Sequence, residues 1–240
     1  MIVVPAHLRP WSVPWPGYSP ADITPPELRP GPGLAESVAE GWAEPCSDPT
    51  CIPDLAERRA AALIPYQVDA EGRPLNPAGR TGRIGRNLGR WGENAAADPI
   101  VIAGTGEDRH LLLIRRSDCG AWAIPGGMVD PGETAPAALV RELREETSVD
   151  LAELTPTVLA RRHVADPRET DWAWIATTAA LYQLPRPVTA TAGDDAADAA
   201  WYPFTDLPAL ETALAGIGGL YRAHRPLLTT ALAATGNRHA

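Results

Sequence analysis

The sequence predicts an α/β fold that follows an irregular, proline-rich N-terminal region. From Asp98 onward, short apolar runs typical of strands alternate with segments of helical periodicity. Before that point, twelve of the 26 prolines fall within residues 1–53, and each proline fixes φ and removes a backbone donor. We therefore expect two parts in this chain of 240 residues, residues 1–97 and residues 98–240.

The N-terminal part contains aromatic residues at positions 11, 15, 18 and 42, which is unusual for a disordered linker. We therefore expect it to pack rather than to move freely. Residues 72–94 are rich in glycine and arginine and form a local basic segment. Two interpretations stay open for it. The segment is either a flexible linker with solvated charges, or a loop whose arginines and backbone donors face anionic oxygen atoms.

The second part is expected to alternate strands and helices around one loop. Expected strands cover residues 99–103, 110–115, 122–124, 158–164, 172–184 and 199–202. A glycine-rich loop at 126–132 leads into a helix at 134–147, with Thr134 as N-cap and Pro136 in the first turn. Two further helices are expected at 207–215 and 219–234, and Pro226 marks a first turn or a kink in the latter.

Composition and charge exclude several functional classes. The formal net charge is −9 and the pI is about 5.0, so the surface repels phosphate backbones and nucleic acid is not an expected partner. No apolar run reaches the roughly 18 residues that a membrane-spanning helix needs, so no membrane partner is expected. The N-terminus lacks the pattern of a signal or transit peptide. We expect a cytoplasmic protein in which Cys46, Cys51 and Cys119 are reduced thiols.

Three carboxylates share one face of the helix expected at 134–147. Glu142, Glu145 and Glu146 stand at positions i, i+3 and i+4, where like charges destabilise a helix and raise one another's pKa values. A divalent cation would remove this conflict, because Mg²⁺ binds a few carboxylate oxygens together with water and phosphate. The alternative is a solvated acidic face, which is what most runs of charge are.

The spacing of these residues with the preceding loop resembles the Nudix box, Gx5Ex7REUxEExGU, in which U is aliphatic. The matching residues are Gly127, Glu133, Arg141, Glu142, Leu143, Glu145, Glu146 and Val149. One position departs from the pattern, because Ser148 stands where the box has its closing glycine. The resemblance implies the Nudix fold, a mixed β-sheet sandwiched between helices, and the hydrolysis of a diphosphate.

The Nudix resemblance also implies roles for individual residues. The catalytic set is Glu133, Arg141, Glu142, Glu145 and Glu146. The metal would be Mg²⁺, with Mn²⁺ as a substitute, and its ligands would be Glu142, Glu145, Glu146 and the carbonyl of Gly126. Arg141 would orient the glutamates through ion pairs, and Glu133 would support the metal site.

Sequence outside the box resembles one branch of the family over about residues 15–235. This branch comprises the mitochondrial-type ADP-ribose pyrophosphatases and the related ADP-ribose-sensing domain of a melastatin-type cation channel. Runs that carry the resemblance include 76–82, 89–92, 96–100, 166–168 and 193–196. The branch implies that ADP-ribose is split into AMP and ribose 5-phosphate, and that residues 1–97 pack on and contribute to the substrate cleft.

The branch further implies a set of substrate-binding residues: Thr81, Gly126, Gly127, Asp166, Arg168, Tyr221 and His224. Each of the last four also suits a simpler role, because Asp166 and Arg168 fit a turn at a strand end, Tyr221 a core position, and His224 the surface. The catalytic base stays open between Asp194 and Asp195, which also fit a Gly-Asp-Asp turn. Two other functions stay open: an ADP-ribose-binding sensor that does not hydrolyse, and a hydrolase of another nucleoside diphosphate derivative.

Overall fold

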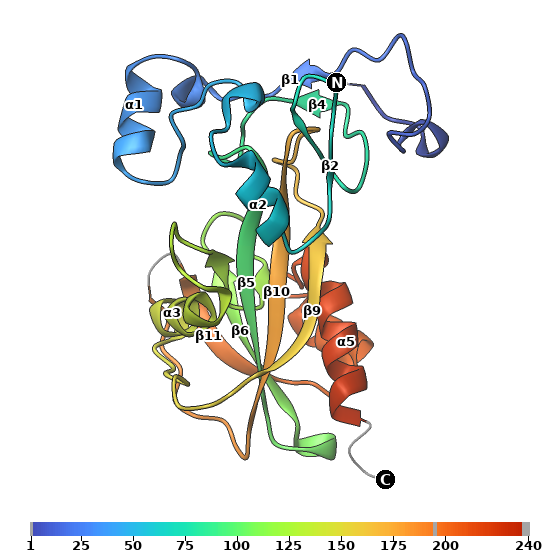
Figure 1. Cartoon of the computed structure of the whole chain (residues 1–240). Helices are drawn as coiled ribbons and strands as arrows, with labels where there is room; N and C mark the ends of the chain where they lie inside the picture. Colours follow the sequence, from blue (N-terminus) through green and yellow to red (C-terminus); the bar gives the residue numbers. More distant parts are fainter. Residues whose placement is uncertain (1, 194–195, 237–240) are drawn as a thin grey trace. The chain divides into compact units, whose positions relative to one another are not determined.

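The computed structural model describes residues 2–193 and 196–236, and the chain divides into two compact units (Figure 1). The first unit contains residues 1–95 and 162–176, and the second contains residues 96–161 and 177–240. Residues 162–176 thus cluster with the N-terminal part, although they lie far along the chain. No described helix is both long and apolar enough to cross a membrane.

The first unit is built from short elements joined by turns. Its two α-helices, α1 and α2, are flanked by single turns of 3-10 helix and by strands of two residues. These elements are η1 (Ala6–Leu8), β1 (Ala21–Asp22), η2 (Pro26–Leu28), α1 (Pro32–Ala39), η3 (Pro49–Cys51), α2 (Leu55–Ala61), β2 (Gln67–Val68), β3 (Pro74–Leu75) and β4 (Arg83–Ile84). The expectation of an irregular, packed region agrees with this arrangement, although it did not include α1 and α2.

Arginines of the basic segment 72–94 hold this unit together from inside. Arg86 is 1% exposed and donates to the backbone carbonyls of Glu44, Cys46 and Leu28. Arg80 is also buried and donates to two further backbone carbonyls. Such long-range bonds satisfy carbonyls that short elements leave without ladder partners. Neither expected interpretation fits these two arginines, because they are neither solvated nor directed at free anions.

The cysteines correct one expectation. Cys46 and Cys51 form a disulfide with a Cα–Cα distance of 5.9 Å, whereas Cys119 is free and exposed. The turn between them explains the pairing: the carboxylate of Asp48 accepts from the amide of Thr50 and starts η3, which brings the two cysteines within disulfide range. The prediction of three reduced thiols is therefore wrong for this pair.

The second unit is organised around a mixed sheet with strand order β11-β6-β5-β10-β9. Strand β6 pairs antiparallel with both β5 and β11. Backbone bonds from Gly92 to Trp172 and from Gly104 to Leu184 join the matching ends of β5 and β10, so these two strands run parallel. The strands are β5 (Gly92–Ala103), β6 (His110–Arg116), β7 (Trp122–Ala123), β8 (Gly127–Met128), β9 (Thr157–Val164), β10 (Ala173–Leu184) and β11 (Ala196–Pro203), with η4 (Gly106–Asp108) between β5 and β6.

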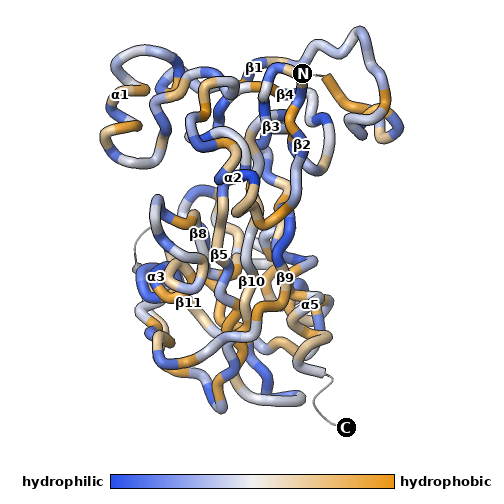
Figure 2. The backbone as a smooth tube through the Cα atoms, viewed as in Figure 1, coloured by the Kyte–Doolittle hydropathy of each residue, from blue (hydrophilic) through white to orange (hydrophobic). Residues whose placement is uncertain are grey.

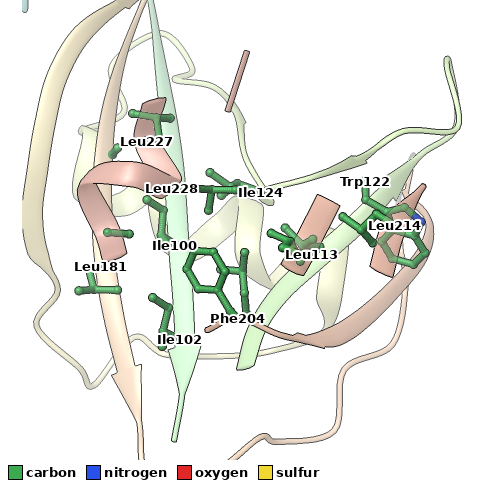
Figure 3. Close-up of a cluster of buried hydrophobic side chains, with 14 residues drawn as sticks. Ile100, Ile102, Leu113, Trp122, Ile124, Leu181, Phe204, Leu214, Leu227 and Leu228 are labelled. Atoms are coloured by element: carbon green, nitrogen blue, oxygen red, sulfur yellow. The ribbon is translucent and has the colours of Figure 1, made fainter. Parts of the chain in front are cut away.

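Helices cover both faces of this sheet, as the sequence predicts. Alternate residues of each strand point to opposite faces, and two separate apolar clusters result. One face packs against α4 (Leu207–Leu214) and α5 (Arg225–Gly236), where Phe204 and Leu228 are fully buried beside Ile100 (Figure 3). The other face packs against α3 (Ala135–Thr147), which carries both hydrophilic and hydrophobic residues (Figure 2).

The two largest differences between expected and observed element boundaries are the starts of β5 and α5. Strand β5 begins at Gly92, well before the expected start at Pro99. Helix α5 begins at Arg225 rather than at Gly219, because Gly219 has a positive φ of 75° and the next residues form η5 (Arg222–His224). Pro226 then stands in the first turn of α5, where its missing N–H costs little.

Candidate active site

Helix α3 carries the box glutamates, and its ends are defined by local chemistry. The Thr134 hydroxyl accepts from the amide of Ala137, which confirms the expected N-cap. Leu139 and Leu143 are buried against the sheet, so the face that carries Glu142 and Glu146 is fixed by packing. At the C-cap, Ser148 adopts the left-handed conformation with φ of 57° and is the one non-glycine residue with positive φ among the described residues.

Arg141 is the centre of an ion-pair cluster that contains four of the five charged residues of the box pattern. Its Nε and Nη2 donate to the two carboxylate oxygens of Glu133, each at 2.9 Å. Its Nη1 donates to Glu142 at 2.8 Å and to Glu145 at 3.0 Å, and Nη2 also donates to the carbonyl of Met128. The bonds with Glu133 raise the pKa of Arg141 and lower that of Glu133. The expected orienting contacts of Arg141 are therefore present.

Glu142 is held in an unusual electrostatic state. Glu142 is 9% exposed. Burial raises its pKa to about 7 even though Arg141 favours the charged form. A carboxylate that titrates near neutrality has lost much of its hydration. A further cation close to this carboxylate would therefore stabilise its charged form.

Two glycines bring backbone atoms against the buried glutamates. The amide of Gly126 donates to Oε2 of Glu146 at 2.7 Å. A Cβ atom on Gly127 would lie 2.6 Å from Oε1 of Glu142, closer than real Cβ atoms come to any atom. A side chain at position 127 would therefore displace the Glu142 carboxylate, because the carboxylate occupies that space.

Among residues 2–193 and 196–236, no group of three or more His, Cys, Asp or Glu side chains is already arranged as a metal-binding cluster. Ion pairing explains this, because Arg141 holds Glu142 and Glu145 while Glu146 turns to the amide of Gly126. The three expected glutamate ligands lie on one helix and each accepts from a protein donor, and Gly126 lies in the preceding loop.

Tyr221 and His224 lie together in the second unit. Their rings meet edge to face with centroids 5.1 Å apart, and the guanidinium of Arg116 lies 5.0 Å from the Tyr221 ring centroid. His224 is buried, and Nδ1 of its ring accepts from the amide of Ile124 at 3.0 Å. Burial lowers the pKa of His224. His224 is therefore not the surface histidine that one alternative interpretation described.

The remaining expected substrate residues belong to the first unit. Thr81 and Asp166 line one cavity of about 360 Å³ together with Arg9, Arg80 and His163. The hydroxyl and the amide of Thr81 both donate to the buried carboxylate of Asp171, at 2.8 and 2.7 Å.

Arg168 and Asp166 form a paired turn in the same unit. Both the amide and the guanidinium of Arg168 donate to the carboxylate of Asp166. The expected alternative of a turn at a strand end therefore describes their local structure. Asp194 and Asp195 lie outside the described residues. The preceding Gly193 donates its amide to the carbonyl of Glu146 at 3.2 Å.

Asp171 and Asp98 are two of the buried carboxylates that the sequence analysis did not single out. Asp171 accepts from Tyr18 and Thr81, and Asp98 accepts from Thr177 at 2.6 Å. Burial raises the pKa of Asp171. An aspartate within an apolar strand pattern, as in the run Asp98-Pro-Ile-Val, was the available signal for Asp98. No comparable pattern marks Asp171.

Family models match nearly the whole chain. The NUDIX domain model matches residues 94–223, and the model of the NUDT9-like, N-terminal domain matches residues 4–92. The chain belongs to the Nudix family. Within it, the mitochondrial ADP-ribose pyrophosphatase of Rattus norvegicus is 35% identical over 246 residues, which cover 85% of this chain and 68% of the rat protein.

Two further relatives of this Nudix protein match a similar share of the chain. A nudix hydrolase of Caenorhabditis elegans is 39% identical over 219 residues, covering 82% of this chain and 81% of the nematode protein. A transient receptor potential cation channel subfamily M member-like 2 protein of Nematostella vectensis is 32% identical over 230 residues. That match covers 80% of this chain and 14% of the channel.

Proposed function

We propose that this Nudix protein hydrolyses the diphosphate of ADP-ribose to AMP and ribose 5-phosphate in the presence of a divalent metal. The observation that carries the proposal is the box cluster, in which Arg141 joins Glu133, Glu142 and Glu145 beside the buried Glu146. The choice of ADP-ribose rests on the rat relative, whose name is ADP-ribose pyrophosphatase. In the reaction, water adds to one phosphorus and the bridging P–O bond breaks.

The box residues fit a divalent metal by their chemistry. Three carboxylates and the carbonyl of Gly126 are hard oxygen donors of the kind that Mg²⁺ and Mn²⁺ prefer. The elevated pKa of Glu142 shows that the protein alone does not fully stabilise its charge. When bound, the metal would neutralise charge on the diphosphate oxygens. Glu142, Glu145, Glu146 and Gly126 are the residues that we propose would hold it.

The chain's own residues would then divide the remaining work. Arg141 keeps Glu142 and Glu145 within reach of one another, and Glu133 anchors Arg141 from the other side with a two-point ion pair. Gly127 leaves room for the carboxylate of Glu142, and the amide of Gly126 donates to the carboxylate of Glu146. Thr81, Asp166, Arg168, Tyr221 and His224 stay predicted substrate-binding residues, and the contribution of residues 1–97 to the cleft stays a prediction.

Product analysis tests the proposal. Purified protein is incubated with ADP-ribose, ADP-glucose or NADH, with Mg²⁺ or with chelator, and the products are separated by chromatography. We expect AMP and ribose 5-phosphate only with Mg²⁺, and fastest from ADP-ribose. The double variant Glu142→Gln/Glu146→Gln should lose turnover by about a thousandfold while it stays folded; Glu107→Gln/Glu153→Gln is the matched control on exposed glutamates.

Other outcomes would redirect the proposal. Faster turnover of another substrate would overturn the choice of ADP-ribose. Tight binding of ADP-ribose without product would identify a binding module instead of an enzyme. The cytoplasmic location stays a prediction, which fractionation of the source cells would test.

A further inference from the structure

A buried carboxylate outside the box lies against Gly126, in the loop that precedes α3. Asp98 is on β5 and is 7% exposed. Its Oδ2 accepts from the hydroxyl of Thr177 at 2.6 Å. Removing a carboxylate from water is costly even after relaxation, and one neutral hydroxyl offsets only part of that cost. The groups around the other oxygen, Oδ1, must therefore offset the rest of that cost.

That oxygen faces a histidine whose tautomer is fixed by a backbone bond. Nδ1 of His224 accepts from the amide of Ile124, so this nitrogen carries a lone pair and the ring hydrogen is on Nε2. Nε2 lies 4.0 Å from Oδ1 of Asp98. At that distance the contact is electrostatic rather than a hydrogen bond, and it favours the N–H end of the ring facing the carboxylate.

Ile124 connects this histidine to the box loop. Its side chain is buried in the apolar cluster beside Leu228 (Figure 3), and its amide is held by His224. Two residues later, Gly126 donates to Glu146. The segment 124–127, which we call the box loop, is therefore fixed at its start by His224 and further along by a box glutamate.

Asp98 also contacts the box loop directly. The register pairs Ala97 with Gly127, so Asp98 is the next residue of β5 on the side of Gly126. A Cβ on Gly126 would lie 2.8 Å from Oδ1 of Asp98 and 2.4 Å from the carbonyl of Ala97. One carboxylate oxygen thus faces both Gly126 and the histidine that holds Ile124.

We propose that Asp98 is a positioning residue for the Nudix reaction: it orients His224, and the two together set the place of the box loop and of Gly126. This inference rests on the proposed function in one respect, that the box loop borders the reacting diphosphate. His224 then acts on the loop, whereas direct substrate binding was the role predicted from the sequence. The two roles differ in which kinetic constant they control.

A double-mutant cycle with Asp98→Asn and His224→Asn separates these roles. Asp98→Asn keeps an acceptor for Thr177 but removes the charge that faces Nε2. His224→Asn supplies a side-chain oxygen for the Ile124 amide but removes Nε2. Each variant should lower kcat by about 10-fold to 100-fold, as the loss of a supporting contact does at a metal site, with KM within about threefold.

The kcat of the double variant should be no lower than that of the less active single variant, because both changes break the same arrangement. Thr177→Val is the matched control: it removes the hydroxyl partner of Asp98 without touching His224, and kcat should fall less than about threefold. Fully additive losses would overturn the proposal. A raised KM with unchanged kcat in His224→Asn would also overturn it, in favour of direct substrate contact.

Hydrogen exchange gives a readout that does not depend on activity. The Ile124 amide should exchange at least about tenfold faster in Asp98→Asn than in the parent protein, and at the parental rate in Thr177→Val. Parental exchange in Asp98→Asn overturns the inference, whatever the enzyme assay shows. If the parent protein does not hydrolyse ADP-ribose, the proposed function fails, but the exchange result still decides whether Asp98 holds the loop. If Asp98→Asn does not fold, the kcat and KM of His224→Asn decide.

Discussion

Arginine side chains stabilise both units of the chain, but with different kinds of partner. In the first unit, Arg86 is buried and donates to three neutral backbone carbonyls, and burial lowers its pKa. In the second unit, Arg141 donates to the carboxylates of Glu133, Glu142 and Glu145, which raise its pKa. The first arrangement replaces missing secondary structure, whereas the second keeps charged groups of the site in place.

The largest effect that this comparison predicts is on the stability of the first unit. Arg86→Met removes the Arg86 donor from the carbonyls of Glu44 and Leu28, whereas the Cys46 carbonyl keeps its bond from Nε1 of Trp91. Each carbonyl that stays buried without a donor costs about 1–3 kcal/mol, so we expect the free energy of unfolding in urea to fall by at least about 2 kcal/mol. Arg90→Met is the control, because Arg90 donates one exposed bond to Gly41. Equal losses in the two variants would contradict the structural role of Arg86.

The matching change in the second unit should affect activity instead. Arg141→Gln removes the ion pairs of three glutamates, and we expect turnover of ADP-ribose to fall about 10-fold to 100-fold. The free energy of unfolding should change by less than about 1 kcal/mol, because Arg141 is partly exposed and solvent screens its pairs. Parallel measurement of kcat and urea unfolding checks both. A loss of stability like that of Arg86→Met would remove the distinction between the two arginines.

A smaller predicted effect concerns how the stability of the second unit depends on pH. Burial raises the pKa of Glu142 to about 7, so the folded state binds this proton more tightly than the unfolded state does. The resulting stability is present at low pH and is lost as pH rises through 7. In metal-free protein, the free energy of unfolding of Glu142→Gln relative to that of the parent should therefore increase by about 2 kcal/mol from pH 5 to pH 8. Unfolding curves at both pH values measure this gain, and a constant difference would contradict the raised pKa.

The smallest predicted effect concerns the end of the box helix. Ser148 has a left-handed backbone, which costs a non-glycine residue about 1–2 kcal/mol, although its hydroxyl recovers part by donating to the carbonyl of Thr191. Ser148→Gly should raise the free energy of unfolding by about 0.5–1 kcal/mol. Ser148→Ala keeps the unfavourable φ and loses the hydroxyl, so it should instead lower stability. Thermal unfolding of the two variants decides this, and a stabilising alanine would refute the account.

Much of the second unit was predictable because its local and long-range signals agree. Thr134 caps α3, apolar positions of α3 face the sheet, and alternate residues of β5 and β6 fill two cores. The direction of Arg80 and Arg86 was not predictable, because no short-range pattern tells a buried guanidinium from a solvated one. The same holds for Asp98, whose partners Thr177 and His224 lie 79 and 126 residues away in the chain. The predicted metal and substrate roles still await measurement.

Gly126 and Gly127 offer a way to separate binding from chemistry with a single methyl group. At Gly126, with φ of 146°, the added carbon would meet the backbone carbonyl of Ala97 at 2.4 Å, so Gly126→Ala strains the main chain. At Gly127 it would meet only the tip of the Glu142 side chain, which would have to give up its bond with Arg141 to make room. Gly127→Ala should thus give a folded protein that does not hydrolyse its substrate. Such a variant would serve as a capture reagent for the intact nucleotide.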